Sequence, residues 1–260
     1  VDELFASFDD TPVAAASIAQ VHFAVTHDGR EVAVKVLRPG IEDAFHRDVD
    51  LLRWIAEIAE KTQPQLRRLK PLASIETLAD TVELEMDLRF EAAACAELRE
   101  NFAGDPDFKV PEVDWQLTAR RVLTTERLIG GIPLDDRDAI VDAGLDPIEV
   151  LTRAAAASFR QVFRDGFFHA DTHPGNMFVL PDGRVAVVDF GIMGRLDLKN
   201  RRAIAEMLVA FLQRDYRRAA EVHFEAGWVP RDRSVDSFTQ ACRSIAEPIL
   251  DKPQNEISIA

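Results

Sequence analysis

Two polar motifs constrain this chain more than any other feature. The loop His169–Asn176, with the sequence HADTHPGN, is followed thirteen residues after Asn176 by Asp189-Phe190-Gly191. Phosphoryl transfer needs one carboxylate that orients the attacking hydroxyl, and a second carboxylate and an Asn oxygen that hold Mg²⁺ on the phosphates. Asp171 suits the first task, while Asn176 and Asp189 suit the second.

The two motifs also occur in the order and at the distance typical of protein kinases, whose signature is His-x-Asp-x₄-Asn followed by Asp-Phe-Gly. The apolar run 185–188 predicts a short strand that delivers Asp189 to the site. A zinc or di-metal centre on His169, Asp171 and His173 is the alternative, but the other histidines lie far away in sequence. We therefore expect a catalytic Asp171, metal ligands Asn176 and Asp189, and a His169 that braces the loop.

An upstream strand carries the lysine that such a site requires. The segment 31–36 is rich in β-branched residues, follows a turn at 27–30, and is interrupted by the charge of Lys35. A strand lysine is commonly a solvated surface residue. At this place in the order of motifs, Lys35 matches the kinase lysine that contacts the α- and β-phosphates. We therefore expect Lys35 and its strand neighbour Ala33 in the nucleotide site.

The segment before that turn is rich in alanine where a kinase has a glycine-rich loop over the phosphates. No glycine precedes Asp28. An alanine run by itself favours a helix, whereas its place before the lysine strand indicates an altered phosphate cover. Alanine adds Cβ atoms, so we expect this cover to favour helical dihedral angles and to be stiffer than a glycine loop. We assign to it Ala14, Ala15, Ala16, Ser17, Ile18, Ala19 and Val21.

These motifs together resemble the UbiB/AarF-type atypical kinases. The resemblance rests on the alanine segment 14–22, the strand 32–36 with Arg38-Pro39-Gly40, the Glu85-Met86-Asp87 element with Glu91, and the loop 169–176. It implies a protein-kinase-like fold, binding of ATP or ADP with Mg²⁺, ATPase-like activity, and a link to isoprenoid quinone biosynthesis or lipid homeostasis.

The resemblance also implies roles for three acidic residues. Glu91 is the helix glutamate that pairs with Lys35, and we expect it to stand solvated in an open cleft. Glu85 and Asp87 contact an N-terminal Lys-x-Gly-Gln element of the family. That element is absent from this sequence, and Ala19 stands where the family loop often has glycine. We therefore expect the sequence to be an excised catalytic core, cut at both ends.

Composition limits the classes of partner. With 260 residues, 47% of them hydrophobic, the chain can bury a sizeable core. A net charge of −14 argues against nucleic-acid binding and against simple adhesion to anionic lipid. Two cysteines form no disulfide framework, which indicates a reducing interior. We find no membrane-spanning run and no signal peptide, and expect a location on the cytoplasmic side, with any membrane association through segments outside this sequence.

The order of elements predicts an α+β, bilobal fold. We expect an N-lobe over residues 1–124, with helical stretches at 41–61 and 72–100, and a hinge at 125–131 where the backbone of Glu126, Arg127 and Leu128 meets adenine. A mainly helical C-lobe follows over 132–260, with a helix at 147–164 that Gly166 ends as a left-handed cap. A further helix starts near Asp197. Few residues separate Gly191 from that helix, so no peptide-docking activation segment fits, which disfavours an ordinary protein kinase.

The expected function is thus an atypical kinase or ATPase. A small-molecule kinase of the aminoglycoside or choline type is one alternative, because it shares the His-x-Asp-x-His-Pro-Gly-Asn loop. A nucleotide-responsive pseudokinase scaffold is another. The expected partners are a nucleotide and a lipid or quinone-precursor ligand, and the phosphoryl acceptor is water, a lipid, a quinone precursor or a protein.

Overall fold

A computed structural model describes residues 1–15, 18–63, 68 and 70–250. The chain forms two compact units, one made of Val1–Ala157 with His169–Met193 and the other of Ser158–Phe168 with Gly194–Ala260. The expected division into 1–124, 125–131 and 132–260 remains a prediction. The motifs of the sequence all lie in the first unit.

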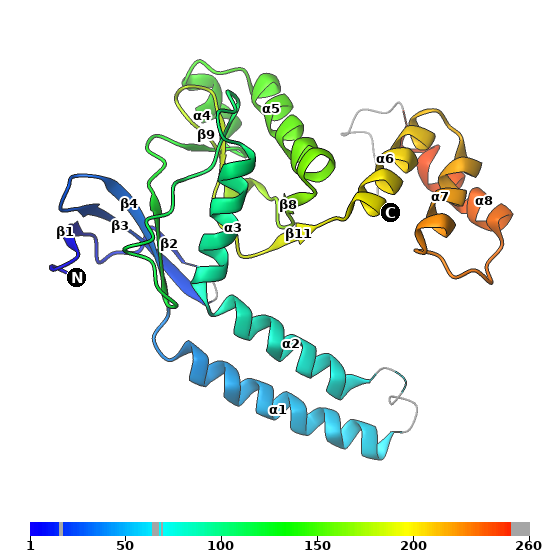
Figure 1. Ribbon diagram of the computed structural model, residues 1–260, viewed down its shortest axis with the longest axis horizontal. Coiled ribbons are helices and arrows are strands. Elements are labelled where there is room, and N and C mark those ends of the chain that lie inside the picture. The colour runs from blue at the N-terminus through cyan, green and yellow to red at the C-terminus, as the bar shows by residue number, and fades with distance from the viewer. Residues whose placement is uncertain (16–17, 64–67, 69, 251–260) are drawn as a thin grey trace. The chain divides into compact units, whose positions relative to one another are not determined.

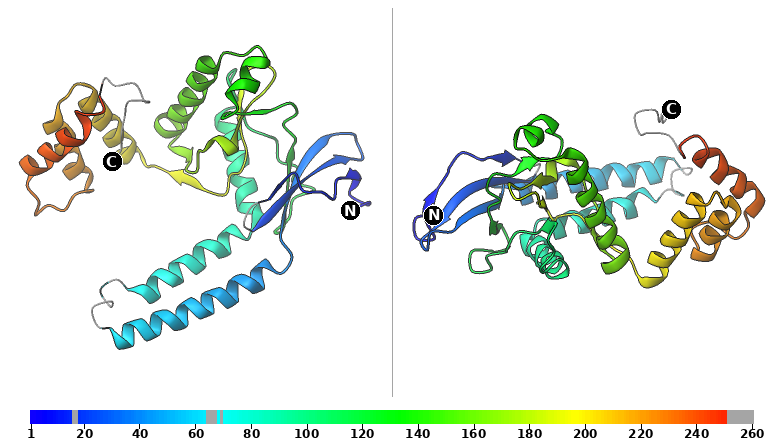
Figure 2. Two further views of the ribbon diagram at one scale, coloured as in Figure 1. Left: turned by 180° about the vertical axis from the view of Figure 1, so that it is seen from behind. Right: turned by 90° about the horizontal axis from the view of Figure 1, so that it is seen from above.

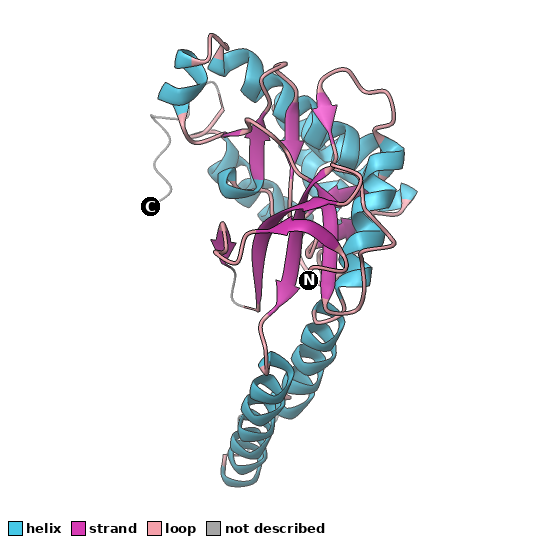
Figure 3. Cartoon of the chain, turned by 90° about the vertical axis from the view of Figure 1, so that its left-hand side faces the viewer, coloured by secondary structure: helices cyan, strands magenta, loops and turns pink. Residues whose placement is uncertain are grey.

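The first unit contains an antiparallel sheet, whose strands are among those drawn in magenta in Figure 3. The strand order is β1-β3-β4-β6, with β2 paired to β3. Its β3–β4 register places Val21 opposite Lys35, and its β4–β6 register places Leu123 opposite Lys35 and Thr125 opposite Ala33. Because side chains alternate between the faces of a strand, these residues share one face. The other face carries a core of Phe5, Ala24, Val32 and Val34. The strands are β1 Phe5–Phe8, β2 Ala14–Ala15, β3 Ala19–Thr26, β4 Glu31–Leu37 and β6 Val122–Glu126.

Between β4 and β6 the described residues form the helices α1 Ile41–Thr62, α2 Pro71–Glu85 and α3 Leu88–Asn101. The helices α1 and α2 lie side by side as an antiparallel pair (Figures 1 and 2). The expectation of one helical stretch over 72–100 is wrong. Asp87 leaves helical geometry, and its side chain accepts the Arg89 N–H as the N-cap of α3. The break lets α3 take its own direction and carry Glu91.

A second sheet, in the order β5-β10-β9-β7, supports the two signature motifs. Val185 of β10 pairs with Val179 of β9, and both side chains are fully buried. The loop 169–176 lies immediately before β9, and Asp189-Phe190-Gly191 comes shortly after β10. The elements of this part are β5 Phe108–Lys109, β7 Ile132–Pro133, α4 Arg137–Asp142, α5 Pro147–Phe159, a short 3₁₀ helix Pro174–Asn176, β9 Met177–Val179 and β10 Val185–Val187.

The helix expected at 147–164 changes geometry near its end. Its α-helical part ends at Phe159, and a wider π-helical turn continues it over Arg160–Asp165. Gly166 then takes φ 66°, the left-handed cap that the sequence predicts.

The second unit is mainly helical. It contains α6 Leu198–Leu212, which starts near Asp197 as expected and has Asp197 as its N-cap, with α7 Tyr216–Ala226 and α8 Val235–Ala246. Its core joins Tyr216 and Ala220 to Cys242 and Ala246. Two further strands, β8 Phe167–His169 and β11 Met193–Arg195, pair with each other. Of the helices in the described ranges, none combines the length and the apolar character that crossing a membrane requires.

We expect Cys95 of α3 to resist alkylation in the native protein. Its side chain is fully buried, its Sγ donates to the Pro111 carbonyl at 3.4 Å, and burial raises the pKa of the thiol to about 12. The unfolded thiol ionises near pH 9, so the free energy of unfolding should fall as pH rises from about 9 towards 12. Iodoacetamide labelling at pH ~8, followed by peptide mass spectrometry, checks this. Labelling as fast as in denaturant would contradict it.

Candidate nucleotide-binding site

A cavity of about 610 Å³ lies against the open face of the β3-β4-β6 sheet. Strand residues form one wall, and residues of the two signature motifs form another. Such a volume is in the range of small-ligand and cofactor sites. The lining includes many of the residues expected from sequence, namely Ala14, Ala15, Ala19, Val21, Ala33, Lys35, Glu91, Glu126, Leu128, Asn176 and Asp189.

Lys35 joins the sheet to α3 and to the Asp-Phe-Gly motif. Its Nζ donates to both carboxylate oxygens of Glu91 at 2.9 Å and to Asp189 Oδ1 at 3.1 Å. Burial would lower the pKa of Lys35, but the charges of Glu91 and Asp189 raise it overall, so the ammonium form is favoured.

The Glu91 side chain is only 8% exposed, so the expectation that it stands solvated in an open cleft is wrong. The Phe190 N–H donates to Glu91 Oε1 at 3.2 Å, so the carboxylate is held between Lys35 of β4 and the Asp-Phe-Gly motif. Burial raises the pKa of Glu91, although Lys35 opposes this rise. The charged form of Glu91 therefore depends on Lys35.

Asp189 is held in an unusual backbone conformation. Its φ is 63°, in the left-handed region that a residue other than glycine seldom adopts. Such local strain is typical of functional sites. The Gly191 N–H donates to Asp189 Oδ1 at 3.2 Å. Burial would raise the pKa of Asp189, but the charge and hydrogen bond of Lys35 lower it overall, so the carboxylate is ionised.

The imidazole of His169 connects the two motifs. Its Nδ1 accepts the Asp171 N–H at 3.2 Å, so its Nε2 carries the proton and donates to the Asp189 carbonyl. Thr172 also donates its hydroxyl to the His169 carbonyl at 2.9 Å. The His169 side chain therefore braces the loop from within, as expected.

The loop 169–176 ends in the short helix Pro174–Asn176. The Asn176 Nδ2 donates to the Asp171 carbonyl at 3.4 Å, which leaves the amide oxygen of Asn176 available to a cation. Asn176 and the ionised Asp189 line the same cavity, and carboxylate and amide oxygens are the ligands of Mg²⁺ in kinases. These residues fit the metal that the sequence leads us to expect. Asp171 is about half exposed.

The phosphate cover is extended rather than helical. Ala14 pairs with Val21 and Ala15 with Gln20 as β2 folds back onto β3, so the expectation of helical dihedral angles is wrong for these residues. Pairing with β3 overrides the local preference of alanine. Ile18 does not line the cavity, and its carbonyl accepts the Arg38 N–H at 2.9 Å. The assigned Ala16 and Ser17 lie outside the described residues.

The three expected hinge residues behave differently from one another. Glu126 and Leu128 line the cavity, whereas Arg127 does not. The Arg127 guanidinium pairs with Glu31 at 2.9 Å and stacks on the Phe23 ring at 3.8 Å. The N–H groups of Glu126 and Arg127 donate to the Glu112 and Glu31 carbonyls, so these two N–H groups are engaged within the protein. The expected contact of this segment with adenine stays a prediction.

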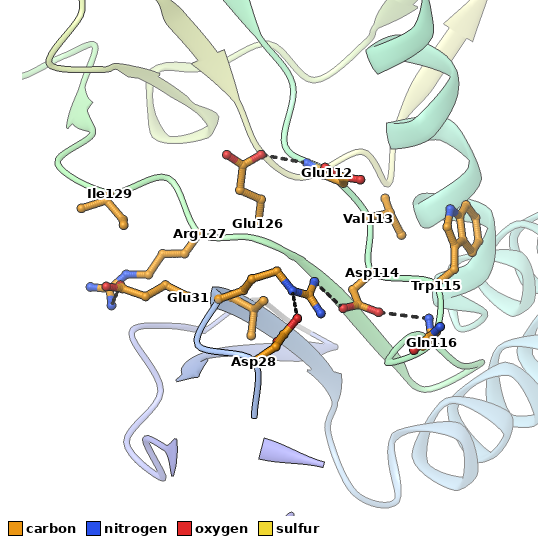
Figure 4. A pocket seen from close by; sticks show the side chains of 12 residues that line it. Asp28, Glu31, Glu112, Val113, Asp114, Trp115, Gln116, Glu126, Arg127 and Ile129 are labelled. Atoms are coloured by element: carbon orange, nitrogen blue, oxygen red, sulfur yellow. Dashed lines mark hydrogen bonds and ion pairs between the residues drawn. The ribbon is translucent and has the colours of Figure 1, made fainter. Parts of the chain in front are cut away.

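Arg127 lines a second cavity, of about 710 Å³, which shares Glu126 with the first (Figure 4). Arg30 bridges Asp28 and Asp114 there at 2.7 and 2.8 Å, and Glu126 pairs with Lys109 at 2.8 Å. Its charged groups thus pair with one another or with neighbouring cations. No residue of the two signature motifs lines this cavity, so the smaller cavity is the candidate nucleotide site.

Several lining residues were missed from the sequence. Leu123 and Thr125 face the cavity because they pair with Lys35 and Ala33, and strand alternation on β6 could have indicated them. Phe178 belongs to β9 and Val188 directly follows β10, and both line the same cavity. Nothing in their sequence distinguishes them from ordinary core residues.

Glu85 and Asp87 lie outside the cavity. Glu85 is the last residue of α2, while Asp87 caps α3 and forms a bidentate pair with Arg89 at 2.9 and 2.7 Å. Their contact with an N-terminal element stays a prediction.

Comparison with known proteins agrees with this geometry. A family model described as the ABC1 atypical kinase-like domain matches residues 1–223. The chain is 42% identical to "Probable protein kinase UbiB" of Xylella fastidiosa strain 9a5c, over 100% of this chain and 48% of that protein. It is 44% identical to the protein of the same name from Aeromonas salmonicida strain A449, over 99% and 48%. The chain thus spans about half the length of these curated relatives.

A solved structure shares the fold. It is described as the complex of Rv3197 with erythromycin from Mycobacterium tuberculosis, with a TM-score of 0.74 and 32% identity, covering 95% of this chain and 62% of that one. The expected α+β, protein-kinase-like fold is confirmed. The chain belongs to the ABC1 atypical kinase-like family, and it is similar over its whole length to relatives named UbiB.

Proposed function

We propose that this chain binds ATP or ADP with Mg²⁺ and acts as a phosphotransferase or ATPase. The observation that carries the proposal is Lys35, which contacts both Glu91 and Asp189 at the wall of a cavity that Asn176 also lines. A lysine fixed by a helix glutamate, beside a carboxylate of metal-ligand type, is how kinases position the phosphates of a nucleotide.

The residues of the site then have separate roles in the reaction. Lys35 holds the α- and β-phosphates, and Asp171 orients the acceptor hydroxyl or water. Asn176 and Asp189 would hold the metal, which when bound neutralises charge on the phosphates. Ala33 and Leu128 border the space for the base and ribose. The paired Glu91 keeps Lys35 in place.

The family suggests the biological setting. We propose a role in isoprenoid quinone biosynthesis or lipid homeostasis on the cytoplasmic side, with a lipid or quinone precursor as ligand and with any membrane association through parts outside this chain. A kinase of the aminoglycoside or choline type would instead need a pocket for a soluble alcohol or amine. A pseudokinase scaffold would bind nucleotide without turnover.

Multiple-turnover phosphate release separates these functions. The assay compares wild type with Asp171→Asn, with and without Mg²⁺, and adds either a lipid extract or a panel of soluble alcohols and aminoglycosides. We expect magnesium-dependent turnover that lipid stimulates and that Asp171→Asn loses while still binding nucleotide. Transfer to a soluble alcohol would favour the small-molecule kinase. Binding without turnover in wild type would favour the scaffold.

The structure solved with erythromycin suggests a second ligand to test. Because Rv3197 is 32% identical over 95% of this chain, we propose that this chain also binds a macrolide. Calorimetric titration with erythromycin, in the presence and absence of ADP, measures that affinity and shows whether the two ligands compete. Absence of heat in both titrations would contradict the proposal.

Glycine in the phosphate cover should increase phosphoryl transfer to the protein itself. Ala14 and Ala15 are exposed in β2 and line the cavity, so their Cβ atoms restrict how closely the backbone approaches a phosphate. We expect Ala14→Gly and Ala15→Gly to change nucleotide affinity and to raise autophosphorylation, measured as incorporation from γ-labelled ATP. Ala6→Gly, in the exposed part of β1, is the matched control. Equal labelling of all four proteins would show that the alanines impose no restraint.

A further inference from the structure

We propose that His173 is a positioning residue for Asp171, a role that rests on the phosphoryl-transfer function proposed above. His173 lies between Asp171 and Asn176 in the catalytic loop and lines the nucleotide cavity. Its Nε2 is 3.8 Å from Asp171 Oδ2. That separation is longer than a hydrogen bond, but catalytic contacts commonly shorten when substrate binds. Both side chains are about half exposed, at 52% and 53%, so water competes for the contact until a ligand fills the cavity.

The backbone determines which edge of the ring faces Asp171. The His173 side chain is the N-cap of Pro174–Asn176, and its Nδ1 accepts the Gly175 N–H at 3.1 Å. An imidazole whose Nδ1 accepts carries its proton on Nε2 when it is neutral. The edge towards Asp171 is therefore a donor. A Cβ at residue 175 would lie 2.9 Å from the ring Cε1, so the glycine lets the ring rest against the loop.

A donor at this place gives the two oxygens of Asp171 different tasks. When His173 Nε2 donates to Oδ2, the carboxylate cannot rotate freely, and Oδ1 remains to accept the proton of the attacking hydroxyl. That proton passes to Oδ1 as the new O–P bond forms and the bond to the leaving nucleoside diphosphate breaks. The backbone N–H of Asp171 already donates to His169, so the two histidines hold the residue at its main chain and at its side chain.

Two substitutions separate the positioning role from the capping role. In His173→Asn the amide oxygen replaces Nδ1 and keeps the cap, since Asn is a strong N-cap residue, but no donor reaches Asp171. In His173→Gln the amide nitrogen replaces Nε2 and can donate to Asp171, while the cap is weakened. We expect His173→Asn to lower kcat roughly tenfold, as loss of an outer partner of a functional group does. His173→Gln should keep most of kcat.

The KM for nucleotide should stay the same in both variants, because the interaction acts on Asp171 and not on nucleotide binding. Calorimetric affinity for ADP with Mg²⁺ and far-UV circular dichroism should likewise be unchanged. Wild-type kcat in His173→Asn would overturn the positioning role. A larger loss in His173→Gln than in His173→Asn would assign the effect to the cap and overturn it as well. Wild type that turns over no faster than Asp171→Asn would overturn the proposed function itself.

Discussion

Asp189→Asn is expected to abolish magnesium-dependent nucleotide binding and turnover while the protein remains folded. Asp189 is ionised in the structure because Lys35 lowers its pKa. An amide at this position loses the negative charge that Mg²⁺ requires of its few protein ligands. It keeps an oxygen that can still accept from Lys35, so the wall of the cavity should stay intact. The measurement is calorimetric titration of ATP or ADP with and without Mg²⁺, together with the phosphate-release rate.

The matched control is Asp182→Asn, the same chemical change on the turn between β9 and β10. Asp182 is about half exposed, pairs with Arg184 at 2.7 Å and does not line the nucleotide cavity. The Asp182→Asn variant should bind Mg²⁺-nucleotide as the wild type does. If Asp189→Asn kept both the affinity and its magnesium dependence, Asp189 would not be a metal ligand.

The polar part of the site could be predicted from the sequence because its chemistry permits few substitutions. The spacing of Asp171, Asn176 and Asp189 follows from one loop and one short hairpin, both of which are local in the chain. Lys35 could be predicted because its strand and its place in the order of motifs match the lysine strand of kinases. Glu91 came from family resemblance alone, since 56 residues separate it from Lys35 and helical periodicity does not select it.

The features that the sequence did not indicate depend on contacts between distant segments. The burial of Glu91 arises from packing of α3 against the Asp-Phe-Gly motif, which no local pattern records. The extended cover arises because β3 offers hydrogen bonds to Ala14 and Ala15, which outweigh their helical preference. The outward direction of Arg127 follows from its pair with Glu31 on the neighbouring strand. Each of these follows from strand register and helix packing.

The burial of Glu91 also changes what is expected of Lys35. Had Glu91 been solvated, removing Lys35 would have affected the reaction and left stability almost unchanged. In the structure Glu91 and Lys35 are 8% and 16% exposed, so Lys35→Met leaves a buried carboxylate without its cation. Loss of one partner of a buried pair typically costs about 3–5 kcal/mol of unfolding free energy. Burial already raises the pKa of Glu91, so part of this cost is relieved when the carboxyl takes up a proton.

A double substitution separates the two effects. Lys35→Met/Glu91→Gln removes both charges at nearly constant volume, so it should recover most of the stability that Lys35→Met loses in urea unfolding. Turnover in both proteins should be lower than in the wild type by a factor of about 10²–10³, because a group that stabilises charge on the phosphates is missing. Lys61→Met, on an exposed lysine of α1 that pairs with Glu57, is the control and should change neither quantity. Recovery of turnover together with stability would show that Lys35 supports the fold and not the phosphates, whereas wild-type turnover in Lys35→Met itself would reduce Lys35 to a structural strand residue.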